Sequence, residues 1–141
     1  DCLFEHLDFK EEKRIFHESK RVLKVGGILN LAVPDGESVL RSWLEAEDNW
    51  KDWYRDDEEA IKEKHWFGTY EYSYNNRWGY LTACLFGSQN GEGQHHKNLY
   101  TIGKLRNICE RLNFNIIDEN VFKWERSKVD DIIRIKAKNE G

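Results

Sequence analysis

The chain of 141 residues contains no methionine and only one proline, Pro34. Because it opens on Asp1 without an initiator methionine, we expect a chain that was processed, cut from a larger protein or recorded incompletely. Its three cysteines, Cys2, Cys84 and Cys109, are widely spaced and form no CxxC pair. This pattern does not support a disulfide framework and is typical of a reducing compartment, so we expect a cytoplasmic protein.

Long apolar runs and an excess of positive charge are also missing. No uncharged apolar stretch approaches the ~20 residues that cross a bilayer, and no leader peptide is visible, so we expect no membrane partner. The 22 Lys and Arg against 26 Asp and Glu give a net charge of −4. That balance argues against a nucleic-acid partner. The length fits one domain, which we expect to span residues 1–141.

Periodic apolar residues predict two amphipathic helices. The first spans residues 8–23, with Asp8 as its N-cap, acidic residues in its first turn and glycines 26–27 as its stop. The second spans residues 101–112, and Asn113 fits the left-handed position that ends a helix.

Three strands are predicted, at Ile28–Val33, Asn115–Val121 and Asp131–Ala137. The first is apolar almost throughout, which suits a strand buried on both faces, as in a parallel sheet. A helix leading into such a strand indicates an α/β fold whose earlier strands precede this chain.

Residues 37–98 differ from the rest because they are rich in Trp and Tyr. We expect an irregular insert with short helices at 39–50, 57–66 and 75–86 and a loop at 87–94. The aromatic side chains either line a pocket for an acceptor molecule or form the core of the insert.

The order of several motifs resembles class I S-adenosylmethionine-dependent methyltransferases. Glu5-His6-Leu7 stands where that family has an E-H-L after strand 4, and residues 21–27, RVLKVGG, resemble its R-V-L-K-P-G-G helix end. Val25 replaces the usual proline. The strand that follows ends in Pro34-Asp35, like strand 5 of the family.

The later part of the chain carries the resemblance further. His96, residues 99–101 and the segment 112–114 follow the family's pattern from helix E into strand 6, with Asn113 in place of its glycine. The likeness is greatest to type 11-like predicted bacterial methyltransferases that are linked to polysaccharide biosynthesis. It implies a truncated Rossmann-like fold, the C-terminal half of a methyltransferase, with a residual sheet of strands 5-7-6, flanking helices and the aromatic-rich helical insert.

Two features that the family uses to bind S-adenosylmethionine have no counterpart here. They are the glycine-rich loop after strand 1 and the acidic residue at the end of strand 2. Gly91-Glu92-Gly93 matches a glycine-rich loop in composition only, because it neither follows a predicted strand nor opens a helix. We therefore expect the full-length parent to bind the cofactor and this fragment to be inactive.

The resemblance also implies site residues at the rim beyond the carboxyl ends of the strands. Glu5 and His6 are the candidate catalytic residues, either one serving as general base toward an acceptor hydroxyl, and with Leu7 they lie beside the cofactor. The alternative is that Glu5 and His6 only cap or solvate the following helix.

Four more residues are candidates for binding the acceptor, a small molecule or saccharide: Asp35, His95, His96 and Tyr100. Asp35 either orients the acceptor or forms a turn, and the two histidines either face the acceptor pocket or lie exposed in a loop. Adjacent histidines without further Cys or His ligands do not make a zinc site, so we expect no metal.

Two functions follow from these patterns. The first is the acceptor-side part of an enzyme that transfers a methyl group to an O or N nucleophile. The second is a non-catalytic Rossmann-derived interaction module, or an incomplete gene product. In the truncated sheet, strand 5 has one exposed edge, so we expect a homodimer joined along residues 28–33 or the surface near them.

Overall fold

A computed structural model of the chain describes residues 3–45, 77–89, 91–123 and 131–141. The predicted helix at 57–66 and the end of the one at 39–50 lie outside the described residues. None of the described helices is both long enough and apolar enough to cross a bilayer.

The first helix begins where its capping residues predict. α1 (Phe9–Val22) follows a single 3-10 turn, η1 (Phe4–His6). The Asp8 side chain accepts hydrogen bonds from the backbone N–H groups of Lys10 and Glu11, and the Glu11 carboxylate accepts one from the Asp8 N–H at 2.8 Å. This reciprocal capping box satisfies N–H groups that the helix itself leaves unpaired.

The described sheet has three strands in the order β1-β3-β2. They are β1 (Ile28–Pro34), β2 (Phe114–Lys123) and β3 (Asp131–Asn139), and both neighbouring pairs are antiparallel. The mixed α/β class is therefore confirmed, but the expectation of a parallel sheet is wrong for the neighbours seen here. For β2 and β3 the physical reason is connection length, because the link over residues 124–130 is too short for the crossover that parallel neighbours need. β1 and β3 lie far apart in the sequence, so connection length does not fix their direction.

β1 is also less buried than its apolar sequence predicts. Only Leu31, Ala32 and Val33 are buried, whereas Ile28 and Asn30 are exposed. On the far face of the sheet, β1 lies beside the charged side of β3. The expectation that β1 is buried on both faces is therefore wrong for the first half of the strand.

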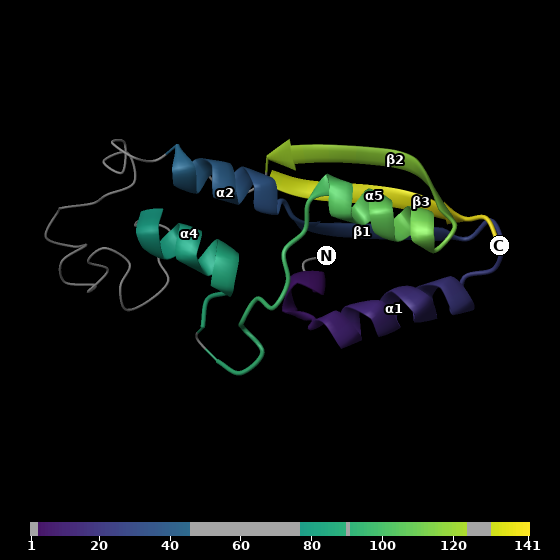
Figure 1. The fold of residues 1–141 in the computed structure, drawn as a ribbon, viewed down its shortest axis with the longest axis horizontal. Helices are drawn as coiled ribbons and strands as arrows, with labels where there is room; N and C mark the ends of the chain where they lie inside the picture. Colours follow the sequence, from purple (N-terminus) through teal and green to yellow (C-terminus); the bar gives the residue numbers. More distant parts are fainter. Residues whose placement is uncertain (1–2, 46–76, 90, 124–130) are drawn as a thin grey trace, which may run out of the picture.

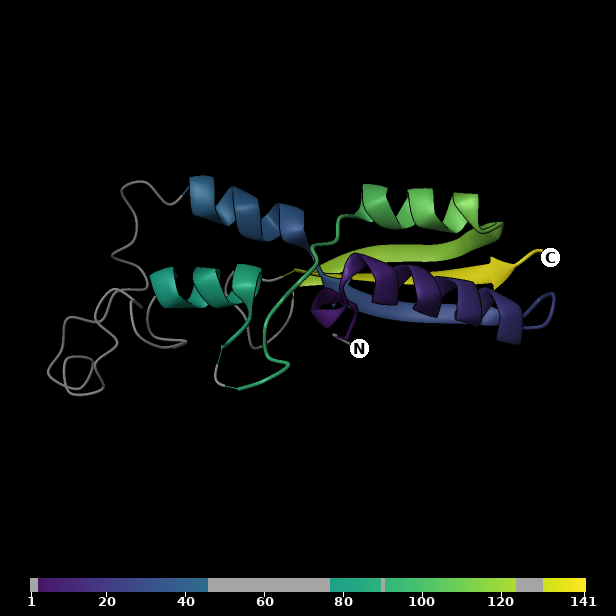
Figure 2. The ribbon, with the colours of Figure 1, turned by 60° about the horizontal axis from the view of Figure 1, so that its bottom comes forward.

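The core lies between the sheet and two helices. α5 (Ile102–Arg111) and α1 cover the same face of the sheet (Figure 2). Phe16 from α1 and Leu105 from α5 pack with Val33, Ile133 and Ile135 in one buried cluster. Because the helices cover only one face, β3 alternates between apolar residues toward the core and basic residues on the other side.

Two further helices lie beyond the carboxyl end of β1. α2 (Gly36–Leu44) and α4 (Arg77–Phe86) pack through Val39 and Leu81, apart from the sheet (Figure 1). α2 begins earlier than predicted because Asp35 caps it, accepting a hydrogen bond from the Glu37 N–H at 3.2 Å. The predicted helix at 75–86 is confirmed over α4.

Candidate functional site

Three distant segments of the chain meet near the carboxyl end of β1. The Glu5 carbonyl accepts hydrogen bonds from the N–H groups of Lys97 and Asn98, at 2.7 and 3.0 Å. The Gly36 N–H donates to the Tyr100 carbonyl at 2.8 Å, and Asp35 and Tyr100 form a parallel bridge. These backbone bonds bring η1 and the loop before α5 to the end of β1.

Within this region Glu5, His6 and His96 form a cluster. His6 Nε2 lies 4.0 Å from Glu5 Oε1, and the His6 and His96 rings meet edge to face with centroids 4.8 Å apart. One possible ligand atom from each of the three side chains lies within 4.8 Å of the other two. The fold thus brings His96 beside Glu5 and His6, a pair that sequence reasoning had singled out apart from it.

Both histidine rings of the cluster are oriented by backbone carbonyls. His6 Nδ1 donates to the His95 carbonyl at 3.1 Å, and His96 Nδ1 donates to the Cys84 carbonyl at 2.9 Å. Because a carbonyl oxygen only accepts, Nδ1 carries the proton in both rings. A neutral ring then has its lone pair on Nε2.

Glu5 is the most unusual member of the cluster because it is 4 % exposed. Its Oε2 atom has no hydrogen-bond partner among the described residues. Burial raises the pKa of the Glu5 carboxyl, an effect that a backbone N–H and the neighbouring His6 only partly offset. An unpaired buried carboxylate weakens a fold, so its presence points to a role other than stability.

Replacing Glu5 with glutamine is expected to stabilise the protein at neutral pH. The raised pKa means that ionised Glu5 is less favourable in the folded than in the unfolded chain, so stability falls as pH rises through the folded pKa. The neutral amide avoids this loss, and we expect a gain of about 1 kcal/mol at pH 7.5, seen as a rise in Tm of about 4 °C.

At pH 3.5 Glu5 is protonated in both states, so the advantage of Glu5→Gln should vanish. Thermal unfolding at the two pH values measures the difference. Glu92→Gln, a change in an exposed loop, is the matched control and should leave Tm unchanged at both. If the Glu5→Gln protein were less stable than the original chain at pH 7.5, this would contradict the conclusion that ionised Glu5 destabilises the folded state.

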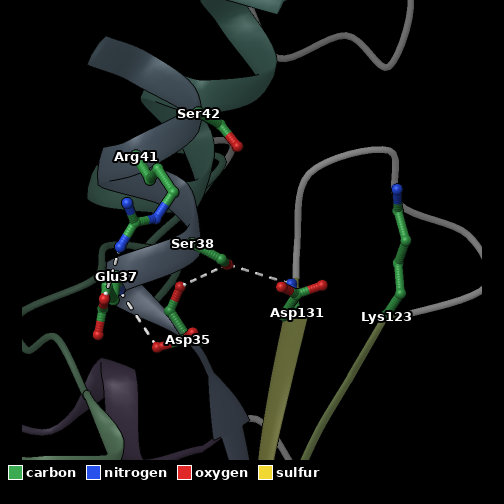
Figure 3. A pocket seen from close by; sticks show the side chains of 7 residues that line it. All are labelled: Asp35, Glu37, Ser38, Arg41, Ser42, Lys123 and Asp131. Carbon is green, nitrogen blue, oxygen red and sulfur yellow. Dashed lines mark hydrogen bonds and ion pairs between the residues drawn. The ribbon is translucent and has the colours of Figure 1, made fainter. Parts of the chain in front are cut away.

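Asp35 lines an open polar pocket of about 260 Å³ (Figure 3). The pocket is lined by charged and hydroxyl side chains: Asp35, Glu37, Ser38, Arg41, Ser42, Lys123 and Asp131. The Asp35 carbonyl accepts from Ser38 Oγ at 2.9 Å. Burial, followed by the negative charges of Glu37 and Asp131, raises the pKa of the Asp35 carboxyl.

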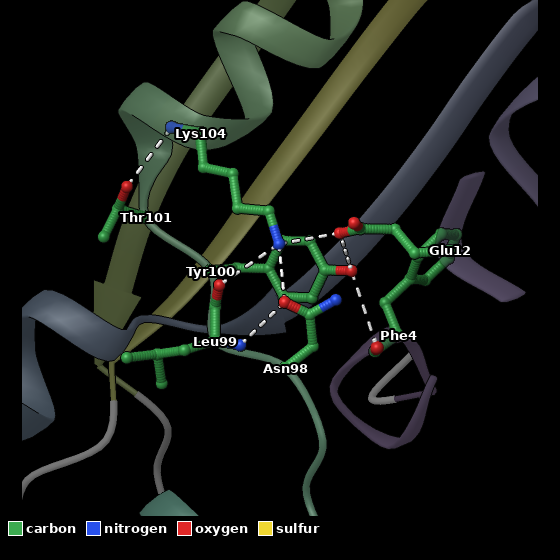
Figure 4. A network of polar contacts seen from close by, with 7 residues as sticks. All are labelled: Phe4, Glu12, Asn98, Leu99, Tyr100, Thr101 and Lys104. Carbon is green, nitrogen blue, oxygen red and sulfur yellow. Dashed lines mark hydrogen bonds and ion pairs between the residues drawn. The ribbon is translucent and has the colours of Figure 1, made fainter. Parts of the chain in front are cut away.

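Tyr100 is 1 % exposed and takes part in a polar network under α1 (Figure 4). Its hydroxyl donates to Glu12 Oε1 at 2.6 Å, and Lys104 Nζ lies 2.7 Å from the same oxygen. Burial and the Glu12 carboxylate together raise the pKa of the Tyr100 hydroxyl. This hydroxyl is therefore engaged inside the fold.

Sequence reasoning missed Glu12 and Lys104. One signal could have found Glu12, because it stands four residues before Phe16 and so shares the apolar face of α1. A charged residue in that position requires a buried partner.

Two candidate residues remain, Leu7 and His95. Leu7 is buried, and its N–H donates to the Phe4 carbonyl at 3.1 Å. The side chain of His95 is exposed, and only its backbone carbonyl contacts the cluster, through His6. Their expected roles beside the cofactor and the acceptor remain predictions.

No described segment forms a strand, glycine-rich loop and helix in succession. Gly91 and Gly93 lie in the loop that runs from α4 to Leu99, so this loop follows a helix and not a strand. The described residues therefore do not by themselves fit S-adenosylmethionine in the way that the family resemblance requires.

No protein-family model, curated protein or solved structure matches this chain. Its function is therefore inferred from its own motifs and geometry.

Proposed function

We propose that this chain is the acceptor-side, C-terminal part of an S-adenosylmethionine-dependent methyltransferase. The observation that carries the proposal is the strand order β1-β3-β2, with β3 antiparallel to both neighbours. This is the order 5-7-6 that the resemblance implies. Because consecutive strands usually lie side by side, insertion of the last strand between the first two is a distinctive feature.

The cluster at the end of β1 is the second support for this function. Glu5 and His6 come from η1, and His96 comes from the loop before α5, so the motif residues converge on the rim where α/β sheets bind their ligands. The polar pocket beside Asp35 suits the hydroxyl groups of a saccharide or another small polar acceptor.

The chemistry that this chain contributes is proton transfer and orientation. With Nδ1 held by the His95 carbonyl, neutral His6 has a basic Nε2 beside the Glu5 carboxylate. His6 can take the proton of an acceptor O–H or N–H, and Glu5 then stabilises the imidazolium. S-adenosylmethionine, when bound, supplies the methyl group, and Glu5, His6 and Leu7 would lie beside it, as the resemblance implies.

We place the enzyme in the cytoplasm, in keeping with its cysteine usage. β1 is at one edge of the described sheet. We propose that this edge joins two copies into a homodimer when the chain is isolated.

The coding sequence upstream of Asp1 tests the proposal. We expect an in-frame segment that encodes a strand, a glycine-rich loop and a helix, followed by an acidic residue at the end of the next strand. A start codon directly before Asp1 would contradict the proposal and favour a non-catalytic interaction module.

A further inference from the structure

We infer that Glu5, His6 and His96 bind a divalent transition-metal ion of the zinc type. This inference goes beyond the proposed methyl transfer and does not depend on it. Two imidazoles and one carboxylate form a common ligand set for Zn²⁺ at sites that keep a position open. The expectation of no metal considered only the adjacent histidines, whereas the fold adds Glu5 and His6 from the other end of the chain.

The distances allow a metal to be bound after a small adjustment. Ligand atoms that surround a tetrahedral Zn²⁺ at ~2.1 Å lie about 3.4 Å from one another. Here His6 Nε2 and Glu5 Oε1 are 4.0 Å apart, and all three ligand atoms lie within 4.8 Å of one another. Binding therefore requires these ligand atoms to move closer together by roughly 1 Å.

The hydrogen bonds behind the cluster are those of metal-binding histidines. A histidine that binds a metal usually donates its other ring N–H to a carbonyl or carboxylate, which fixes the ring and its tautomer. His6 does this toward the His95 carbonyl, and His96 does it toward the Cys84 carbonyl. With Nδ1 bonded to a carbonyl in each ring, Nε2 is the ring nitrogen through which each histidine would bind a metal.

Glu5 supplies an independent observation. The side chain is more than nine-tenths buried, and its Oε2 atom has no partner among the described residues. Because the side chain is buried, solvent does not stabilise the charge of the carboxylate. Among the described residues, its only ion pair is the long contact with His6. A bound cation would compensate for this buried charge.

The ligand types favour Zn²⁺ over Mg²⁺ or Ca²⁺, which take oxygen ligands almost exclusively. Three protein ligands leave a fourth position for water or for an oxygen of another molecule. A bound metal ion would occupy His6 Nε2, so His6 would no longer serve as the general base. The ion would instead act as a Lewis acid and lower the pKa of the bound hydroxyl.

Titration of the metal-free 141-residue chain with Co²⁺ and then Zn²⁺ tests the inference. We expect one equivalent of Co²⁺ to bind with visible absorption bands of a low-coordinate site, and Zn²⁺ to displace it. Glu5→Gln and His96→Ala should each weaken binding at least tenfold. His95→Ala and His17→Ala should bind within twofold of the original chain, because both side chains are exposed and His95 contributes only its carbonyl.

Three outcomes would overturn the inference. They are the absence of saturable binding, a Glu5→Gln protein that binds as tightly as the original chain, and a loss in His95→Ala as large as that in Glu5→Gln. Circular dichroism checks that each variant folds. Glu5→Gln is expected to fold at least as well as the original chain, so it decides the outcome if His96→Ala does not fold.

Discussion

Replacing Ile133 with alanine is expected to destabilise the fold by about 3 kcal/mol. Ile133 lies in β3, the central strand, where it pairs with Val33 and has no exposed surface. The change removes buried methyl groups and leaves a cavity between the sheet and its two helices. Urea unfolding, followed by circular dichroism, measures the loss as a lower midpoint with an unchanged slope.

Ile117→Ala is the matched control for this prediction. Ile117 lies in β2, the strand beside β3, but its side chain is 51 % exposed. We expect its replacement to change stability by no more than about 0.5 kcal/mol. Equal losses in the two variants would contradict the assignment of the core to one face of the sheet.

Gly87→Ala is expected to destabilise the fold about as much as Ile133→Ala does, and also to disturb the candidate site. Gly87 has φ +84°, and a Cβ atom there would lie 1.8 Å from the Gln94 carbonyl oxygen. Gly87 also forms a bridge with His95. We expect a loss of more than 2 kcal/mol, together with weaker Co²⁺ binding because the loop that carries His96 is displaced.

Gly93→Ala separates the steric clash from the backbone conformation. Gly93 has nearly the same φ, +83°, but a Cβ atom there would meet nothing within 4 Å. We expect a loss of about 1 kcal/mol, and unchanged Co²⁺ binding. If Gly93→Ala proved as damaging as Gly87→Ala, the close approach of Gln94 would not be the cause.

The ends of α1 and α5 were predictable because their signals are local. Asp8 and Thr101 cap α1 and α5 as expected, and Asn113 takes the left-handed position with φ +54°. The Asp8 and Thr101 side chains bond to backbone atoms no more than three residues away. No long-range information is needed to place them.

The burial of β1 was not predictable in the same way, because it depends on a neighbouring strand. Asn30 and Lys136 are partners in the register, and this pairing leaves the far face of β1 polar in its first half. An apolar run by itself does not distinguish a strand buried on both faces from one that contributes only part of its length to the core.

The candidate site was predictable residue by residue but not as a cluster. The motif resemblance singled out Glu5, His6 and His96, and their separation in the sequence gave no distances. Their proximity comes from the two hydrogen bonds that the Glu5 carbonyl accepts from Lys97 and Asn98. Such backbone contacts carry no side-chain signature, so the three-residue cluster emerged only from the structure.

Calorimetric titration of S-adenosylhomocysteine tests the proposed function most directly. It compares the 141-residue chain with a protein that also contains the residues encoded in frame upstream of Asp1. We predict one site per chain in the longer protein and no binding to the shorter one, whose described residues contain no strand, glycine-rich loop and helix in succession. Saturable binding to the 141-residue chain, or none to the longer protein, would contradict the assignment of this chain as the acceptor side of a methyltransferase.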